Sequence, residues 1–220
     1  MKGDVLPVIL AEDSVGDRDI VGIMGHSKAY PVLRSSSPAD TFALAQRLRT
    51  LMSWQKPTVR LGAELQTIDD VLRMVHILPN ALYEAEGAPF DPEWSTHEFR
   101  ADTFPADTDE FQALLPLILD VEMPVDELEE SFVQALGAGP ATIDWAGAWP
   151  DVPELGLVAD PMFEGIQAVF NSDDLDWERP AHDHTVFVHL SKGSAFPTTG
   201  AEWLAGQVGA RVLGGPLLGW

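Results

Sequence analysis

The sequence predicts an α+β fold, in which a mixed β-sheet is flanked by helices, in a single compact domain over residues 1–220. Short apolar runs bounded by Gly, Asp and Ser are interspersed with segments whose apolar residues recur at helical spacing. A chain of 220 residues, of which 45% are hydrophobic, is long enough to bury a sizeable core. Neither an internal repeat nor a low-complexity tract divides it.

The first third of the chain predicts strands followed by a well-capped helix. Residues 5–11, 20–24 and 29–34 are short apolar runs that we expect to be strands. Ser37 is a suitable N-cap and Pro38 suits the first helical position, so the pattern predicts a helix that begins there and ends near residue 54.

The next elements are a strand over residues 58–61 and a second helix. Thr67 and Asp70 form a capping-box pattern with Asp in place of Glu, which predicts the start of this helix. Its apolar face ends at Leu78, and Pro79 is expected to break or kink it.

The middle of the chain is richer in Pro, Gly and acidic residues. The pattern predicts a long connection over residues 87–106, helices over 107–121 and 126–136, and a loop over 137–160. The remaining elements are expected to be a helix over 161–170, a strand over 185–190, a helix over 199–208 and a last strand over 210–213.

The net charge of −22 is confined to one stretch of the sequence. Residues 1–83 carry nine acids and nine bases, and residues 181–220 carry two of each. Residues 84–180 carry twenty-four acids against only Arg100 and Arg179. Such a block repels nucleic acid and anionic membranes and attracts a cationic surface. The alternative is a solvated face that only keeps the protein in solution.

Tryptophans inside the acidic stretch favour an interface over simple solvation. Aromatic side chains set among carboxylates are typical of a surface that meets a basic partner, although buried core residues that cover loops are the alternative. The expected partner-binding residues are Trp94, Asp107, Asp109, Glu110, Glu127, Glu130, Trp145, Trp149, Asp173, Asp174, Asp176 and Trp177.

Residues 8–21, which read VILAEDSVGDRDIV, resemble the first strand and acidic pair of a response-regulator receiver domain. In that family the carboxylates, here Glu12 and Asp13, would hold Mg²⁺. The resemblance implies a phosphoacceptor Asp some forty residues later, but residues 50–65 contain no Asp. Without the acceptor, phosphoryl transfer cannot take place.

Two further patterns suggest metal ligands. His182 and His184 lie two positions apart ahead of a strand and could share one face, whereas His189 would point to the other. Whether this pair binds a metal stays open. The acidic run 173–178 could collect a hard cation, but it lacks the glycine and distal Glu of an EF-hand, and a solvated loop is the alternative.

The sequence contains no motif specific to catalysis or to a cofactor. It has no P-loop, no dinucleotide fingerprint and no G-x-S-x-G elbow. No basic patch with interleaved aromatic residues is present, so direct binding of nucleic acid is not expected. Cysteine is absent, which excludes a disulfide framework and a thiol nucleophile. The apolar run 5–11 is too short to span a membrane, and we expect a soluble, cytoplasmic protein.

Together these observations predict an acidic binding or inhibitor protein that neutralises a basic protein partner. Immunity proteins do this against toxins, and DNA mimics do it against DNA-binding proteins. A small hydrolase that uses carboxylates or a metal is one alternative. A structural or assembly subunit is another, for which residues 215–220 would serve as a docking tail or would instead pack into the core.

Overall fold

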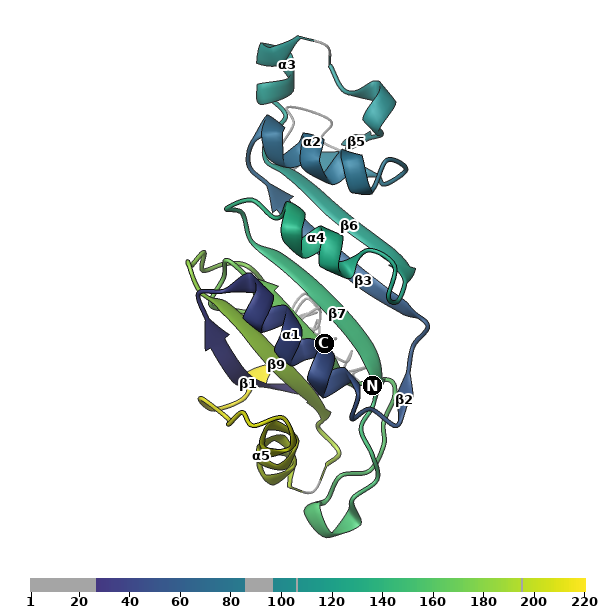
Figure 1. Cartoon of the computed structure of the whole chain (residues 1–220), viewed down its shortest axis with the longest axis vertical. Coiled ribbons are helices and arrows are strands. Elements are labelled where there is room, and N and C mark those ends of the chain that lie inside the picture. The colour runs from purple at the N-terminus through teal and green to yellow at the C-terminus, as the bar shows by residue number, and fades with distance from the viewer. Residues whose placement is uncertain (1–26, 86–96, 106, 195) are drawn as a thin grey trace, which may run out of the picture.

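The computed structural model describes residues 27–85, 97–105, 107–194 and 196–220. A ten-stranded sheet runs through the whole molecule, in the order β10-β1-β9-β8-β7-β3-β6-β4-β5, with β2 paired to β7. Every pairing between these strands is antiparallel, so the predicted α+β class is confirmed, whereas the expected mixed sheet is not observed. Figure 1 shows the sheet running from β5 to β1.

The strands are β1 (Ser27–Ser35), β2 (Trp54–Gln55), β3 (Thr58–Leu65), β4 (Tyr83–Ala85), β5 (His97–Phe99), β6 (Leu117–Pro124), β7 (Ala141–Ala148), β8 (Glu164–Phe170), β9 (His184–Ser191) and β10 (Leu217–Leu218). The α-helices are α1 (Pro38–Arg49), α2 (Ile68–Ile77), α3 (Thr108–Gln112), α4 (Glu129–Ala135) and α5 (Pro197–Gln207), and two short 3₁₀ turns span Ala101–Thr103 and Pro153–Leu155. Among the described residues, no helix is long and apolar enough to cross a membrane.

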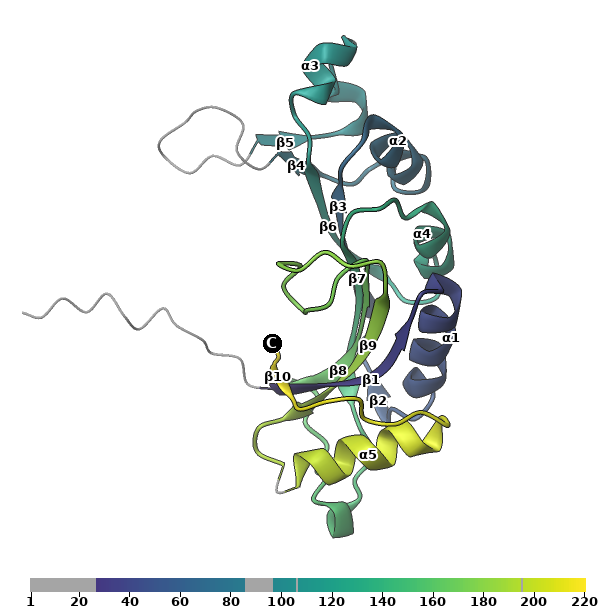
Figure 2. The ribbon, with the colours of Figure 1, turned by 90° about the vertical axis from the view of Figure 1, so that its left-hand side faces the viewer.

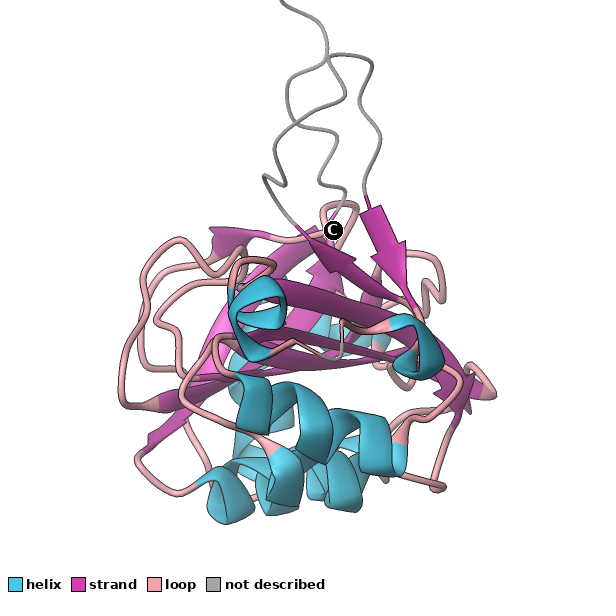
Figure 3. Cartoon of the chain, turned by 90° about the horizontal axis from the view of Figure 1, so that it is seen from above, coloured by secondary structure: helices cyan, strands magenta, loops and turns pink. Residues whose placement is uncertain are grey.

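Helices α1, α2 and α4 cover one face of the sheet, as Figures 2 and 3 show. Side chains alternate between the two faces of a strand, so every second residue points to these helices. In β3 the residues Val59, Leu61, Ala63 and Leu65 are all almost fully buried in the core. Helix α5 packs on β9 and β1 at one end of the sheet.

The other face of the sheet is concave and carries no helix among the described residues (Figure 2). The loop between β8 and β9 folds over it, and so does the segment that ends at Trp220. Its exposed strand positions include the charged residues Arg60, Asp120 and Glu122.

Both helix starts expected from the sequence are confirmed. The Ser37 hydroxyl accepts a hydrogen bond from the backbone N–H of Asp40, and Pro38 is the first residue of α1. At α2 the Thr67 hydroxyl accepts from the N–H of Asp70, while the Asp70 carboxylate accepts from the N–H of Thr67. Helix α2 ends at Ile77, two residues before Pro79.

Three predictions for the middle of the chain are wrong, because residues expected in helices or loops form sheet strands. The segment 107–121 is helical only over α3, and β6 follows Pro116, which cannot continue the helix. The expected loop 137–160 contains β7, and the expected helix 161–170 becomes β8. In β8 all seven residues are buried, so no alternation distinguishes it from a helix.

The ends of the chain differ from the prediction in smaller ways. The expected strands over residues 5–11 and 20–24 lie outside the described residues. The strand at 185–190 and the helix at 199–208 are confirmed as β9 and α5. Residues 210–213 form no strand, and the short β10 pairs with β1 instead.

Replacing Thr67 with Ala removes one half of the capping box of α2. We expect T67A to lower the free energy of unfolding by about 1 kcal/mol, because an N-cap hydroxyl satisfies an otherwise unpaired N–H. Urea denaturation measures this loss. T108A is the matched control, since Thr108 is exposed in the first turn of α3 and caps no helix; equal losses in both variants would show that the capping box does not stabilise the fold.

Candidate functional site

Charged side chains form ordered rows across the concave face. In one row Arg60 of β3 lies between Glu122 of β6 and Asp144 of β7, and Asp144 is paired in turn with Gln167 of β8. Residues directly opposite in an antiparallel pair share a face, so these four side chains lie side by side. In another row Glu98, Glu84, Ile118 and Glu64 follow one another across β5, β4, β6 and β3.

Carboxylates greatly outnumber cations on this face. Among the described residues, the acids on its strands are Glu64, Glu84, Glu98, Asp120, Glu122 and Asp144, and Asp176 lines the cleft from the β8–β9 loop. Arg60 and Lys56, the bases beside these strands, are paired with two of the acids. Arg60 donates to both oxygens of Asp120, with Nε 2.7 Å from Oδ1, and Nζ of Lys56 lies 2.7 Å from Oε1 of Glu122. The face therefore presents a net negative charge.

A cleft of about 420 Å³ opens in the middle of this face. It is lined by residues from five strands, the β8–β9 loop and the segment 218–220: Arg60, Gly62, Ile118, Leu119, Asp120, Thr142, Asp144, Gln167, Leu175, Asp176, Trp177, His189, Leu218, Gly219 and Trp220. A cleft of this size is in the range of ligand sites. Its walls combine carboxylates with two indole rings.

Among the carboxyl groups that line the cleft, Asp144 combines burial with few partners from the protein. One of its oxygens accepts a hydrogen bond of 2.8 Å from the Thr142 hydroxyl, and no other hydrogen bond or ion pair reaches it from the described residues. Burial raises the pKa of Asp144 to about 7, against the smaller opposing effects of the Thr142 hydrogen bond and the charge of Arg60. The group therefore changes its charge near neutral pH.

His189 forms the floor of the cleft and is fully buried. Its Nδ1 lies 3.1 Å from the Ser27 hydroxyl and its Nε2 lies 3.1 Å from Oε1 of Gln167, while the ring stacks on Trp220 at a centroid distance of 3.5 Å. Because the assigned Gln167 oxygen can only accept, the proton of the neutral ring is on Nε2 and Ser27 donates to Nδ1. Burial lowers the pKa of His189 to about 3, so this ring stays uncharged.

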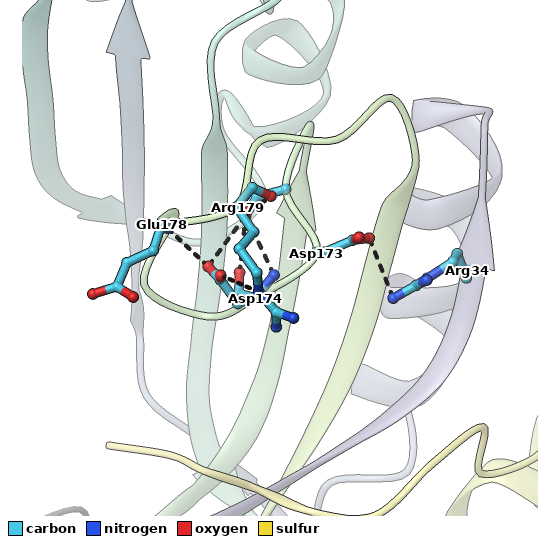
Figure 4. Close-up of polar contacts among 6 residues, drawn as sticks. Arg34, Asp173, Asp174, Glu178 and Arg179 are labelled. Atoms are coloured by element: carbon cyan, nitrogen blue, oxygen red, sulfur yellow. Dashed lines mark hydrogen bonds and ion pairs between the residues drawn. The ribbon is translucent and has the colours of Figure 1, made fainter.

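A dense set of contacts fixes the β8–β9 loop (Figure 4), which carries Trp177 of the cleft lining. Asp174 accepts hydrogen bonds from the Arg179 side chain at 2.9 Å and from the N–H of Glu178 at 3.0 Å, and Arg34 pairs with Asp173 at 3.2 Å. Burial alone would raise the pKa of Asp174, but the hydrogen bonds from Arg179 and Glu178 help to lower it overall. The conformation of the loop is therefore fixed by its own hydrogen bonds and by an ion pair to β1.

Apolar packing fixes the same loop from below. Leu175 and Trp177 pack on a small cluster formed by Ala29, Val169 and Phe187. The indole of Trp177 also lies over Gly62, where a Cβ atom would come within 2.9 Å of the ring. Trp177 has a φ of 66°, a left-handed conformation that is costly for a bulky residue.

The expected partner-binding residues fall in several separate places. Asp176 and Trp177 line the cleft, whereas Asp173 and Asp174 are used to build the loop beside it. Asp107, Asp109 and Glu110 are exposed at the start of α3, and Glu127 and Glu130 are exposed at the start of α4. Trp94 lies outside the described residues.

Two of the expected binding residues belong to the core instead. Trp145 is 2% exposed and Trp149 is fully buried. Their indole N–H groups are satisfied internally, by Glu129 at 3.4 Å and by the carbonyl of His189 at 2.8 Å. The structure thus supports the core alternative for both, and we exclude them from the binding face.

Sequence reasoning missed Arg60, Asp120 and Asp144. The missed signal is the period-two pattern of β6 and β7, in which Asp120 and Glu122, or Thr142 and Asp144, alternate with buried apolar residues. Once these segments are recognised as strands, alternation alone places their acids on the face opposite to the core.

The suggested metal ligands do not converge within the described part of the chain, where no three His, Asp or Glu side chains are grouped to hold a metal ion. His184 accepts a hydrogen bond of 3.1 Å from the N–H of Asn171 and contacts Phe170 on the helix side of the sheet, whereas His189 lies on the concave side, as the parity of the strand predicts. Glu12 and Asp13 lie outside the described residues, and the antiparallel sheet differs from the parallel sheet of a receiver domain.

Comparisons of the chain with protein-family models, with curated proteins and with solved structures found no significant match. Any function proposed for the chain therefore depends on the charge and geometry of the concave face.

The raised pKa of Asp144 predicts a pH-dependent stability. Between pH 5 and 7 the folded state keeps the Asp144 proton while the unfolded chain has lost it, so the free energy of unfolding falls as pH rises and levels off above pH 7. Relative to D144N, the wild type should lose about 2–3 kcal/mol over this range, since one pKa unit corresponds to 1.36 kcal/mol.

Urea denaturation of wild type and D144N at several pH values measures this difference. The comparison cancels the contribution of Glu164, another carboxyl group whose pKa burial raises to about 7. D109N is the control, because Asp109 is exposed on α3, and its difference from wild type should stay constant. A constant difference for D144N as well would contradict the raised pKa.

Proposed function

We propose that this protein binds a basic protein partner through the concave face of its sheet, as an immunity protein or a DNA mimic does. The observation that carries the proposal is the set of seven carboxylates on the described strands of this face and in its cleft, beside Arg60 and Lys56, which are already paired with two of them. Helices α1, α2 and α4 cover the opposite face, and no helix of the described residues covers this one (Figure 2).

The row of Glu98, Glu84 and Glu64 supports a binding role. Glu84 and Glu98 are directly opposite each other on β4 and β5, and like charges in such a pair destabilise a sheet. A fold that needed these residues only for solubility could place them on an exposed helix at no such cost. A cationic partner would relieve the repulsion between Glu84 and Glu98, and this relief would favour binding.

A basic protein suits this face better than other classes of partner. Nucleic acid and anionic membranes would be repelled by the carboxylates, whereas Lys and Arg side chains would be attracted over about 8 Å at physiological salt. Complementary charge mainly accelerates encounter, so its loss should appear in the association rate constant.

A second candidate function, a small carboxylate-dependent hydrolase, is favoured by one observation. Asp144 keeps its proton near neutral pH while Asp120, in the same cleft, is paired with Arg60. Two carboxyl groups in such different environments are typical of an acid and a base in hydrolytic sites. Turnover of a chromogenic glycoside that is lost in both D144N and D120N would support this candidate over the first.

The third candidate, an assembly subunit with a docking tail at residues 215–220, has less support. Leu217 and Leu218 pair with β1, and Trp220 stacks on His189. The segment is therefore already packed on its own sheet, which is the alternative that the sequence left open.

Neutralising the carboxylate row should slow association with a basic ligand. We expect the triple variant E64Q, E84Q and E98Q to bind an octa-arginine peptide with an association rate constant about tenfold lower at low salt, with a smaller difference at high salt. Stopped-flow fluorescence of a labelled peptide measures both rates.

The control removes the same number of charges from helices outside the concave strands. D109N, E110Q and E130Q lie on α3 and α4, so this triple variant has the same net charge as the first. It should bind at close to the wild-type rate. Equal losses in the two triple variants would show that the peptide responds to net charge alone and would overturn the concave face as the binding surface.

A further inference from the structure

We propose that the central cleft is an anchor site for one arginine side chain of the basic partner, with the guanidinium at Asp144 and its stem against Trp177. This inference rests on the proposed binding role and names the chemical group that the cleft takes. Three features of the cleft support it: a carboxyl group with an unoccupied oxygen, walls formed by aromatic rings, and an uncharged residue at the bottom.

The free carboxyl group is that of Asp144. Thr142 occupies one of its oxygens, and the second receives no hydrogen bond or ion pair from the described residues. Arg60 does not fill this role, because its Nε and Nη2 atoms both bind Asp120. An incoming cation therefore meets a carboxyl group that the protein has left available.

The aromatic walls are suited to a guanidinium rather than to a compact ammonium group. Trp177 and Trp220 both line the cleft, and a planar guanidinium stacks on indole rings while its edge binds a carboxylate. The conformation of Trp177 is fixed by its packing on Gly62 and by the hydrogen bonds of the β8–β9 loop. Little entropy is lost on binding when the walls are already in place.

The neutral floor removes a source of repulsion. His189 is enclosed between Ser27, Gln167 and the Trp220 ring, and it stays uncharged because of its burial. A charged imidazole at the same place would oppose a cation. With Arg60 neutralised by Asp120, the charges left for the ligand are those of Asp144 and, from the loop above, Asp176.

Binding of a cation should be coupled to ionisation of Asp144. Arg60, Asp120 and Glu122 face it from β3 and β6, the uncharged Gln167 faces it from β8, and Asp176 lies on the loop above the cleft. A bound guanidinium favours the charged form of the carboxyl group, so binding releases a proton and strengthens as pH rises from 6 to 8.

The test uses Nα-acetyl-arginine amide as the probe, titrated into the isotopically labelled full chain and followed by NMR at the indole N–H signals of Trp177 and Trp220. We expect saturable shifts at these two signals and an affinity that increases from pH 6 to pH 8. Nα-acetyl-citrulline amide has almost the same shape without the charge, and it should bind at least about tenfold more weakly, because a charged hydrogen bond contributes more than a neutral one.

Two variants test whether the arginine probe binds to the carboxyl group of Asp144. D144N should lower the affinity for the arginine probe about tenfold and remove most of its pH dependence, whereas D109N, with the same change of charge, should leave both unchanged. G62A is a second test, because its methyl group would displace the Trp177 ring. Equal binding of the arginine and citrulline probes by the wild type would overturn the anchor site whether or not the variants fold.

The anchor site and the binding face can fail separately. Octa-arginine could bind the triple variant E64Q, E84Q and E98Q at the wild-type rate while the arginine probe still binds in the cleft. In that case the concave face is refuted as the surface for a basic protein, and the cleft is a site for a free guanidinium ligand. If octa-arginine responds to the triple variant while the probe shifts no cleft signal, the face stands and the anchor site is refuted.

Discussion

The one-sided covering of the antiparallel sheet determines where every other feature of this protein can lie. Helices α1, α2 and α4 take up the apolar positions of the strands, and the alternate positions must then face away from them. Each charged residue in β3, β6 and β7 is placed on the concave face by this rule alone. The cleft thus follows from how the core is built, and the β8–β9 loop and the segment 217–220 complete it.

Carrying charge on this face has a cost to stability. Asp144 keeps a proton that an exposed aspartate would lose, and Glu84 lies opposite Glu98 without an intervening cation among the described residues. Individual exposed ion pairs such as Arg60 with Asp120 contribute little, on the order of 0–1 kcal/mol. Arrangements that cost stability and are not repaid within the fold are most easily understood as serving contact with another molecule.

The sequence predicted local structure well where one short-range interaction decides it. The hydroxyl caps of Ser37 and Thr67 are examples, because a cap depends on residues within one turn. It failed at β6, β7 and β8. There, strand formation depends on neighbours far away in the chain, and the fully buried run of β8 carries no periodic signal.

The distribution of charge along the sequence did not predict the distribution of charge on the surface, for a related reason. A block that is contiguous in sequence is divided between α3, α4 and the concave face, while Arg60 and Glu64 of the concave face come from the neutral segment 1–83.

The division of roles within the acidic run 173–178 shows how a loop can be both charged and ordered. Asp173 and Asp174 are engaged with Arg34 and Arg179, and Leu175 and Trp177 pack on Phe187 and its neighbours. Asp176 is therefore the carboxylate of this run that lines the cleft, beside Trp177. A solvated loop with the same composition would sample many conformations and lose their entropy on binding. Because this loop is fixed before any ligand arrives, the carboxylates and indoles of the cleft are held at set positions, and shape as well as charge can select the partner. In the proposed binding role, charge alone would attract any basic protein, whereas the fixed cleft would discriminate between such partners.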